Sequence, residues 1–187
     1  LYAEQALQER ICKVLHDLRA SKLVKETITN NGGKPAETRV GHTFFSEEIH
    51  DDLEIVFAGE LSGHYYFPAF GAPWDDGFMA AVLMANIAAS GELDEKLNSL
   101  PDYPVSPELR IDCPEERKDP VVEGVKKEFS DHEMSTVDGV KIYFEKGWAL
   151  VRPSNTEEKM SVRVEADDEE SLDQILSEVE GAVRELI

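Results

Sequence analysis

Apolar residues along the first hundred positions form short strand-like runs separated by segments with helical spacing. Residues 11–15 and 55–58 are largely apolar runs bounded by polar turns, which is typical of buried strands, and residues 36–40 predict a shorter strand. A helix is indicated after Ser21, which can cap it, and another is indicated from Ser46. Because strands alternate with helices, we expect an α/β domain, namely a βαβ mixed sheet with flanking helices.

Residues 78–89 are apolar on every side of a predicted helix, so we expect this helix to be buried all round. Asp75 or Asp76 can cap its N-terminus, and Gly91 can end it. A short helix is indicated for residues 93–97.

Three prolines, Pro101, Pro104 and Pro107, follow closely on one another. Proline fixes its own backbone angle and restrains the residue before it, so this stretch predicts an extended linker. We therefore place a domain boundary there, with one domain over residues 1–105 and a smaller one over residues 106–187.

Alternating apolar and polar residues dominate the second half of the chain. Residues 140–144 and 148–151 predict a hairpin, and residues 160–166 alternate again. A strand is predicted at 109–111, and a helix is predicted to begin at Asp119 and Pro120. A second helix, with a long amphipathic stripe, is predicted after Asp167, which begins a capping box. This pattern predicts an α+β domain with an antiparallel sheet and helices on one face.

The chain is strongly acidic, with a formal net charge of −20 over 187 residues spread across both halves. Nucleic-acid binding needs a basic surface, so the charge argues against that class of partner. No apolar run is long enough to span a membrane, and no membrane partner is expected. Cys12 and Cys113 have no metal or redox spacing, which favours a reduced, cytoplasmic protein.

Candidate chemistry gathers at predicted strand ends. The strand 55–58 is followed by a loop in which Gly59 and Gly63 bracket Glu60 and Ser62, with His64 directly after. In a parallel sheet the earlier strand ends, which carry Arg19 and His42, would meet the same edge, where ligands usually bind. The alternative interpretation is a polar turn with isolated surface residues.

A second candidate lies between the hairpin and the strand 160–166. Arg152 can bind a phosphate through two hydrogen bonds, and Ser154, Asn155 and Thr156 supply short donors beside backbone N–H groups. The alternative is an ordinary connecting loop, because Ser, Asn and Thr all favour turns.

The loop 59–64 resembles the sugar-binding loop of the α-D-phosphohexomutases, the phosphomannomutase/phosphoglucomutase family, and residues 152–157 resemble that family's phosphate-binding loop. The resemblance covers the whole chain as the third and fourth domains of a four-domain enzyme. The family's phosphoserine loop and Asp-rich metal loop are not found here. One departure is Glu158, where members commonly have proline. Asn155 favours the phosphomannomutase/phosphoglucomutase subgroup over the phosphoglucosamine mutases, which commonly have glycine there.

The resemblance implies a C-terminal half-enzyme that takes part in moving phosphate between C1 and C6 of a hexose through a bisphosphate. It implies sugar contacts from Glu60 and Ser62, and contacts to the distal phosphate from Arg152, Ser154, Asn155 and Thr156. His42, His64 and Arg19 are the implied catalytic residues. The implied partners are a hexose phosphate and the missing N-terminal domains of the same enzyme. Mg²⁺ and phosphoserine would belong to those domains, and no metal site is expected in this chain, which we expect to be inactive alone. The alternative is a stand-alone, non-catalytic module that binds or senses sugar phosphates.

Overall fold

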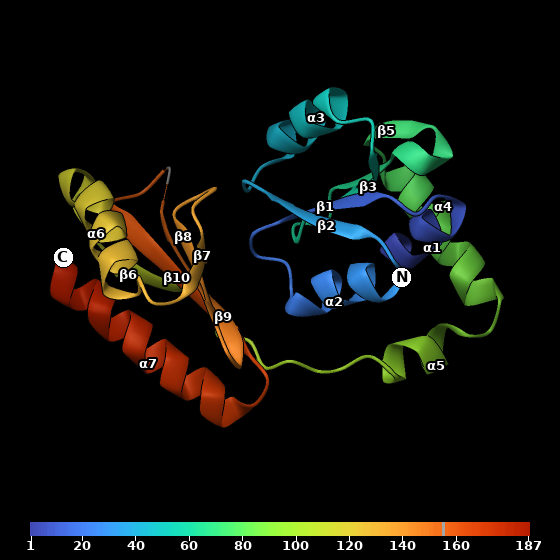
Figure 1. Cartoon of the computed structure of the whole chain (residues 1–187). Helices are drawn as coiled ribbons and strands as arrows, with labels where there is room; N and C mark the ends of the chain where they lie inside the picture. The colour runs from blue at the N-terminus through green and yellow to red at the C-terminus, as the bar shows by residue number, and fades with distance from the viewer. Residues whose placement is uncertain (155) are drawn as a thin grey trace. The chain divides into compact units, whose positions relative to one another are not determined.

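The computed structural model describes residues 1–154 and 156–187, and it divides into two compact units, Leu1–Asp102 and Tyr103–Ile187. Asn155, one of the expected phosphate-binding residues, lies outside the described residues. The chain just after the division belongs to the second unit, because Val105 bridges to Glu165 and the Ser106 amide donates to the Val164 carbonyl at 2.8 Å. Figure 1 shows the two units and the chain that joins them.

The first unit is built on a mixed five-stranded sheet, as the sequence predicts. Its strand order is β2-β1-β3-β4-β5, and β1 pairs in parallel with both β2 and β3, whereas β3, β4 and β5 pair antiparallel. The strands are β1 (Lys13–Asp17), β2 (Lys34–Thr38), β3 (Ile55–Gly59), β4 (Tyr65–Phe67) and β5 (Ala72–Asp75), with a 3₁₀ turn η1 (Pro68–Phe70) between the last two.

Helices cover both faces of this sheet (Figure 1). The helices that contribute side chains to its cores are α1 (Tyr2–Glu9), α2 (Lys22–Asn30), α3 (His42–Asp51) and α4 (Gly77–Ala89). The short helix α5 (Leu93–Asn98) has no buried residue. Leu15 packs in one core cluster with α3, whereas its neighbour Val14 belongs to another cluster with α1, α2 and α4. Successive strand residues point to opposite faces, so one strand contributes to both cores.

Two predictions for the first unit are wrong. Helix α3 begins at His42 rather than Ser46, because Gly41 takes the N-cap position with φ +134° and the Ser46 hydroxyl donates to the His42 carbonyl from inside the helix. Helix α4 is not buried all round. Leu83 is buried, but the side chains of Phe78 and Val82 are 89% and 56% exposed, because the described residues pack against only one side of the helix.

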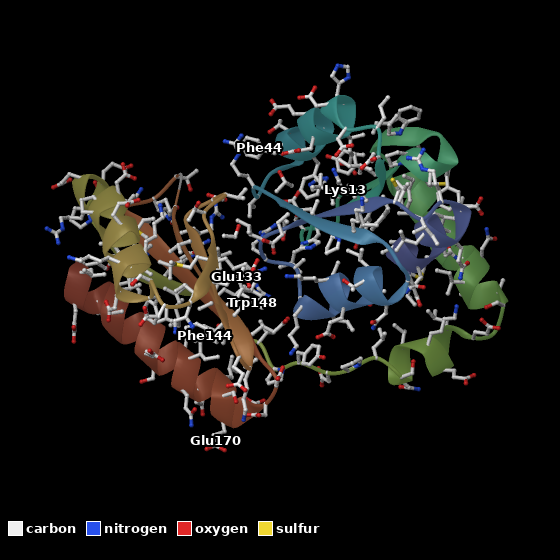
Figure 2. The ribbon with its side chains drawn as sticks, in the orientation of Figure 1. Lys13, Phe44, Glu133, Phe144, Trp148 and Glu170 are labelled. Atoms are coloured by element: carbon white, nitrogen blue, oxygen red, sulfur yellow. The ribbon has the colours of Figure 1, made fainter. Side chains whose placement is uncertain are left out.

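The second unit contains an antiparallel sheet in the order β6-β10-β9-β8-β7, with helices packed on it, which confirms the predicted α+β class. Its elements are β6 (Leu109–Asp112), α6 (Glu115–Glu128), β7 (Glu133–Ser135), β8 (Val140–Phe144), β9 (Gly147–Pro153), β10 (Lys159–Ala166) and α7 (Glu169–Leu186). Phe144 and Trp148 flank the tight turn between β8 and β9 (Figure 2), and Trp148 is buried.

The two helix starts in this unit differ from the prediction. Helix α6 begins at Glu115 and continues through Pro120. Proline cannot donate a backbone hydrogen bond, but the burial of Val121 and Val125 on the following turns stabilises the helix beyond it. Asp168, not Asp167, caps α7 and accepts a hydrogen bond from the Ser171 amide at 2.7 Å. Among the residues that the structure describes, none of the helices is both long and apolar enough to cross a bilayer.

Candidate functional site

The carboxyl ends of β1, β2 and β3 meet at one edge of the first sheet, because these strands are parallel. The structure brings four predicted residues together there. Arg19, after β1, donates from Nη2 to the Glu60 carboxylate after β3 at 3.0 Å. The rings of His42 and His64 lie 5.7 Å apart between their centroids. Residues far apart in the sequence therefore form one polar cluster at the edge where ligands of such sheets bind.

The loop after β3 is closed by its own backbone. The Glu60 amide donates to the His64 carbonyl and the Gly63 amide donates to the Glu60 carbonyl, both at 2.9 Å. Gly63 has φ +93°, a conformation that favours glycine, whereas Gly59 is not among the glycines with positive φ. An added Cβ at Gly59 would instead lie 3.3 Å from ring atoms of Phe57 and Tyr65. This closure leaves Ser62 exposed at the loop tip.

Asp17, which the sequence analysis did not single out, is the residue that holds this cluster together. Its side chain is fully buried, and Oδ2 accepts hydrogen bonds from Arg19 Nη2 at 2.7 Å, Arg19 Nε at 3.1 Å and the Leu61 amide at 3.1 Å. Oδ1 accepts from the Arg19 amide at 2.8 Å. One carboxylate thus fixes the guanidinium after β1 and the loop after β3. A signal was present in the sequence, since this acid follows the end of the predicted strand 11–15 by two residues.

Glu60 presents half of its carboxylate to this network. Its side chain is only 5% exposed and Oε1 pairs with Arg19. Oε2 is buried and has no hydrogen-bond partner among the described residues. An unpaired buried carboxylate oxygen is costly, so a hydroxyl or amine donor that reached it would be bound favourably.

His64 is oriented by Asp75 at the end of β5. His64 Nδ1 lies 2.5 Å from Asp75 Oδ2, and the Tyr65 amide contacts the other oxygen at 3.3 Å. The hydrogen bond to Asp75, assisted by the charges of Asp75 and Glu60, raises the pKa of His64 above its ordinary value. The neighbouring acid, Asp76, caps α4 by accepting from the Met79 amide at 2.8 Å. The imidazolium form of His64 is therefore favoured beside the cluster.

Replacing Asp75 by asparagine is expected to lower the pKa of His64, because the neutral amide no longer stabilises the imidazolium. A raised folded-state pKa contributes stability that is complete below the unfolded value and is lost as the pH rises through the folded value. The variant should therefore lose stability relative to wild type on the acidic side and converge with it on the alkaline side. The His64 Cε1 proton shift measured against pH reports this, and an unchanged midpoint would contradict the pairing.

The second candidate cluster lies where β9 passes into β10. Arg152 is in β9 rather than in the loop, its Nη2 lies 3.3 Å from Asp138 Oδ2, and its buried Nε has no hydrogen-bond partner among the described residues. The Ser154 hydroxyl accepts from the Glu157 amide at 3.2 Å and the Thr156 amide at 3.4 Å. Arg152 therefore retains a donor that the described residues do not satisfy.

Two tethers fix this loop to its surroundings. Lys118, buried in α6, donates from Nζ to the Ser154 carbonyl at 2.7 Å and also pairs with Glu115. The Cys113 amide donates to the Glu158 carbonyl at 2.9 Å. This backbone hydrogen bond restrains the position of Glu158, which is the departure from the resembled loop named in the sequence analysis.

A hollow of about 240 Å³ adjoins this loop. Three cationic side chains line it, together with the carboxylates of Glu108 and Glu157; the cations are Arg110, Arg152 and Lys159. Arg110 and Lys159 were not predicted as site residues, because both lie outside the motif at residues 152–157, Arg110 in β6 and Lys159 at the start of β10. In a chain of net charge −20, a hollow with more cations than carboxylates is a local exception.

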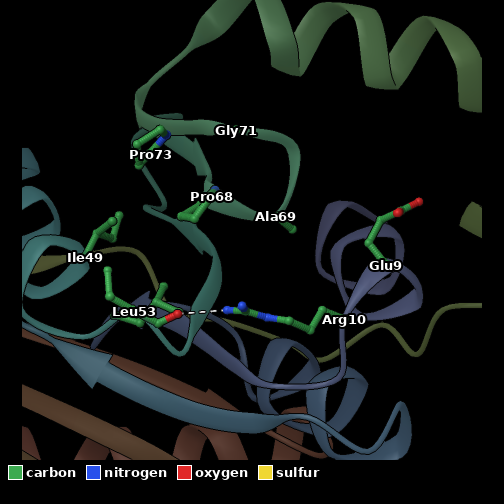
Figure 3. A pocket seen from close by; sticks show the side chains of 9 residues that line it. Glu9, Arg10, Ile49, Leu53, Pro68, Ala69, Gly71 and Pro73 are labelled. Carbon is green, nitrogen blue, oxygen red and sulfur yellow. Dashed lines mark hydrogen bonds between the residues drawn. The ribbon is translucent and has the colours of Figure 1, made fainter.

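Another hollow, of about 610 Å³, lies at the opposite edge of the first sheet, before the starts of β1 and β3 (Figure 3). Arg10 crosses it and donates to the Leu53 carbonyl at 2.8 Å. It contains none of the predicted site residues. Within residues 1–154 and 156–187, no group of His, Cys, Asp and Glu side chains is arranged to hold a metal ion.

Two family models match the chain. One, described as phosphoglucomutase/phosphomannomutase, alpha/beta/alpha domain III, matches residues 1–103. The other, described as the C-terminal domain of the same family, matches residues 108–182.

Curated relatives carry several names from this group. The chain is 32% identical to a phosphomannomutase of Methanocaldococcus jannaschii over its full length, which is 41% of that protein. It is 32% identical to a phosphoglucomutase of Neisseria meningitidis over 98% of the chain and 41% of the relative. A probable phosphoglucosamine mutase of Methanopyrus kandleri is also 32% identical, over 94% of the chain and 39% of the relative. The chain thus spans about two fifths of these relatives, and their names do not single out one sugar.

Solved structures share the fold. A phosphoglucomutase/phosphomannomutase family protein from Burkholderia thailandensis matches with a TM-score of 0.87 and 24% identity, over 99% of the chain and 40% of that structure. An N-acetylphosphoglucosamine mutase from Aspergillus fumigatus, solved with GlcNAc-6P and magnesium, matches with a TM-score of 0.66 and 15% identity, over 97% of the chain and 44% of that structure.

Proposed function

The chain belongs to the phosphoglucomutase/phosphomannomutase family, and we propose that it forms the substrate-holding C-terminal part of a phosphohexomutase. In this proposal the first unit binds the hydroxyl groups of a hexose phosphate and the second unit binds a phosphate group distant from the reacting end. The whole enzyme would move phosphate between C1 and C6 of the sugar. The observation that carries the proposal is the half-paired Glu60 carboxylate, buried and fixed through Arg19 at the ligand-binding edge of the sheet.

Glu60 and Ser62 are the proposed sugar contacts. A buried carboxylate with one free oxygen suits a sugar hydroxyl, because the hydroxyl donates a hydrogen bond without adding charge. Arg19 orients the Glu60 carboxylate through its hydrogen bond, and Asp17 in turn positions Arg19. Ser62, exposed at the loop tip, can donate or accept with a second hydroxyl.

Arg152, Ser154, Asn155 and Thr156 are the proposed phosphate contacts. Arg152 offers a buried Nε donor, and Arg110 and Lys159 add positive charge to the same hollow. A phosphate would compete with Asp138 for the Arg152 guanidinium, because both are anions that bind the N–H groups of the same guanidinium.

His42 and His64 are proposed to act near the transferred phosphoryl group. His64, favoured as imidazolium by Asp75, can place positive charge and a proton there. His42 lies at the N-terminus of α3, where the helix dipole also favours an anion. The phosphoserine that carries the phosphoryl group and the Mg²⁺ that neutralises its charge would be supplied by other domains of the enzyme.

Titration of the 187-residue chain with ligands tests the two binding roles separately. Glucose 1-phosphate should shift the backbone amide signals of residues 60–64 and of the 154–159 loop in an NMR spectrum. Inorganic phosphate should shift only the second set, because it lacks hydroxyl groups for the first unit to read. A titration in which neither set moves with glucose 1-phosphate would contradict the proposal.

Replacing Arg152 by alanine is expected to weaken phosphate binding by roughly tenfold to a hundredfold, as expected for the loss of a charged hydrogen bond worth about 1.5–3 kcal/mol. Arg184→Ala is the matched control, because it removes the same charge from α7, where Arg184 forms a local pair with Glu180. Equal affinity losses in both variants would indicate general electrostatics rather than a specific contact.

Catalysis distinguishes a half-enzyme from a stand-alone module. We expect no mutase turnover when the 187-residue chain is assayed with glucose 1-phosphate, glucose 1,6-bisphosphate and Mg²⁺. Turnover at rates typical of an intact enzyme would contradict the proposal that the chain is half of an enzyme. If the chain binds the ligands and its coding sequence contains no upstream domains, the stand-alone binding module is favoured instead.

A further inference from the structure

One side of α4 is apolar and uncovered. Ala80, Leu83 and Ile87 point into the first unit, and the opposite side exposes a second apolar stripe. We define this stripe as the α4 apolar face; it consists of Phe78, Ala81, Val82, Ala85 and Ala89, all exposed. Trp74, which is 58% exposed, precedes the N-terminus of α4. Its indole N–H donates a hydrogen bond at 3.1 Å to the carboxylate of Asp76, the N-cap residue of the helix.

The composition of α4 is unusual for a solvent-facing helix. Charged residues make up 31% of the chain, yet the helix Gly77–Ala89 has no Asp, Glu, Lys or Arg on any side. A surface helix normally places charged residues on its outer side. Clustered large apolar side chains beside small alanines, with no charge among them, are typical of a contact surface on which another element can pack closely.

We propose that the α4 apolar face is the docking surface for the domain that precedes domain III in this family's chain order. The family models assign the chain to domain III and the C-terminal domain, and the relatives are more than twice as long, so their remaining length lies ahead of the matched part. The chain enters the first unit through α1, and the Tyr2 hydroxyl donates to the Ala80 carbonyl of α4 at 2.9 Å. A preceding domain would therefore be tethered directly beside α4 (Figure 1).

A tethered domain fits this surface better than a second copy of the chain. A stripe from one helix plus Trp74 is a small contact area, and independent partners usually need a standard-size interface to associate stably. Domains of one chain associate through smaller surfaces, because the tether provides a high effective concentration. The inference depends on family membership and not on the sugar and phosphate contacts, so it can fail or hold independently of them.

Thiol labelling tests the inference. Val82→Cys in the 187-residue chain should react quickly with a maleimide, whereas in the full-length protein with its own N-terminal domains it should react roughly tenfold or more slowly. Thr29→Cys, at an exposed position of α2, is the control that should react at similar rates in both. Labelling is read peptide by peptide, which separates the introduced thiol from the partly exposed Cys12. Equal Val82→Cys rates in the two proteins would overturn the proposal.

A second variant gives a stability readout. Because Phe78 is 89% exposed, Phe78→Ser should leave the Tm of the 187-residue chain unchanged but lower the Tm of the full-length protein. Analytical sedimentation of the 187-residue chain tests whether a second copy of the chain covers the α4 apolar face instead. If the chain forms a dimer that Phe78→Ser dissociates, a second copy covers this face and the proposal is wrong. A coding sequence without preceding domains would also overturn it.

Discussion

Replacing Asp17 by alanine is expected to lower the free energy of unfolding of the first unit by about 3–5 kcal/mol, the cost typical of breaking a buried ion pair by removing one partner. The buried carboxylate satisfies the Arg19 guanidinium, the Arg19 amide and the Leu61 amide at once. Without it, Glu60 is the one charged partner that Arg19 keeps among the described residues. A domain that is stable by about 5–15 kcal/mol would lose a large part of its margin. Hydrogen exchange of the β1 and β3 amides in the native state measures the loss.

Asp51→Ala is the matched control, because this exposed carboxylate at the end of α3 should change stability by no more than about 0.5 kcal/mol. A double-mutant cycle with Arg19→Ala separates the pair from the rest of the network. We expect a coupling energy of about 0.5–3 kcal/mol, in the range measured for residues of one network. If Asp17→Ala and Asp51→Ala changed the free energy of unfolding by the same small amount, the strand-end cluster would not depend on the Asp17 carboxylate. The proposal that Asp17 positions Arg19 would then be wrong.

The parts of the fold that depend on hydrophobic periodicity were predictable from the sequence. The strands at β1 and β3, the hairpin of β8 and β9, and the amphipathic α7 follow from alternation or helical spacing, and the α/β and α+β classes follow from their order. Three of the short strands were not predicted, although the four-residue β6 was. β4, β5 and β7 have three or four residues each, too few for a period to show, and their pairing depends on neighbours distant in sequence.

Helix boundaries and burial depend on contacts that a single segment does not contain. Pro120 suggested a helix start, but α6 begins earlier, where Glu115 and Glu116 suit the N-terminal dipole. The apolar α4 suggested full burial, yet periodicity reports only that a face can be buried, and not what covers it.

The sequence predicted which loops carry the candidate site, but not the hydrogen bonds that connect their side chains. Arg19, His42, Glu60 and His64 could be expected at one sheet edge because parallel strands end together. Asp17 and Asp75 were missed as positioning residues, since an acid at a strand end is also the ordinary start of a turn. Only the structure shows that one binds Arg19 and the other binds His64.

Replacing Gly139 by alanine is expected to destabilise the second unit by about 2–5 kcal/mol and to abolish phosphate binding at Arg152. Gly139 has φ +73°, which costs an L-residue roughly 1–2 kcal/mol, and overpacking adds about 1–3 kcal/mol. An added Cβ would lie 2.3 Å from the Val151 carbonyl oxygen and 2.8 Å from Arg152 Cα, so the turn or β9 must move. Because Asp138 pairs with Arg152, the movement would reach the guanidinium. The buried Trp148 provides a fluorescence signal for unfolding of this unit.

Two further variants, one at another glycine and one at Gly139 itself, separate the causes of this effect. Gly181→Ala in α7 meets no atom within 4 Å and sits inside a helix, so it should stabilise the unit by roughly 0.5–1 kcal/mol, the opposite sign. Gly139→Asn tolerates a positive φ but still carries a Cβ, so it should retain the steric part of the loss and the weakened phosphate binding. If Gly139→Asn had wild-type stability and phosphate affinity, backbone strain alone would explain the alanine variant. The close approach of the 138–139 turn to Arg152 would then play no part in holding the phosphate loop.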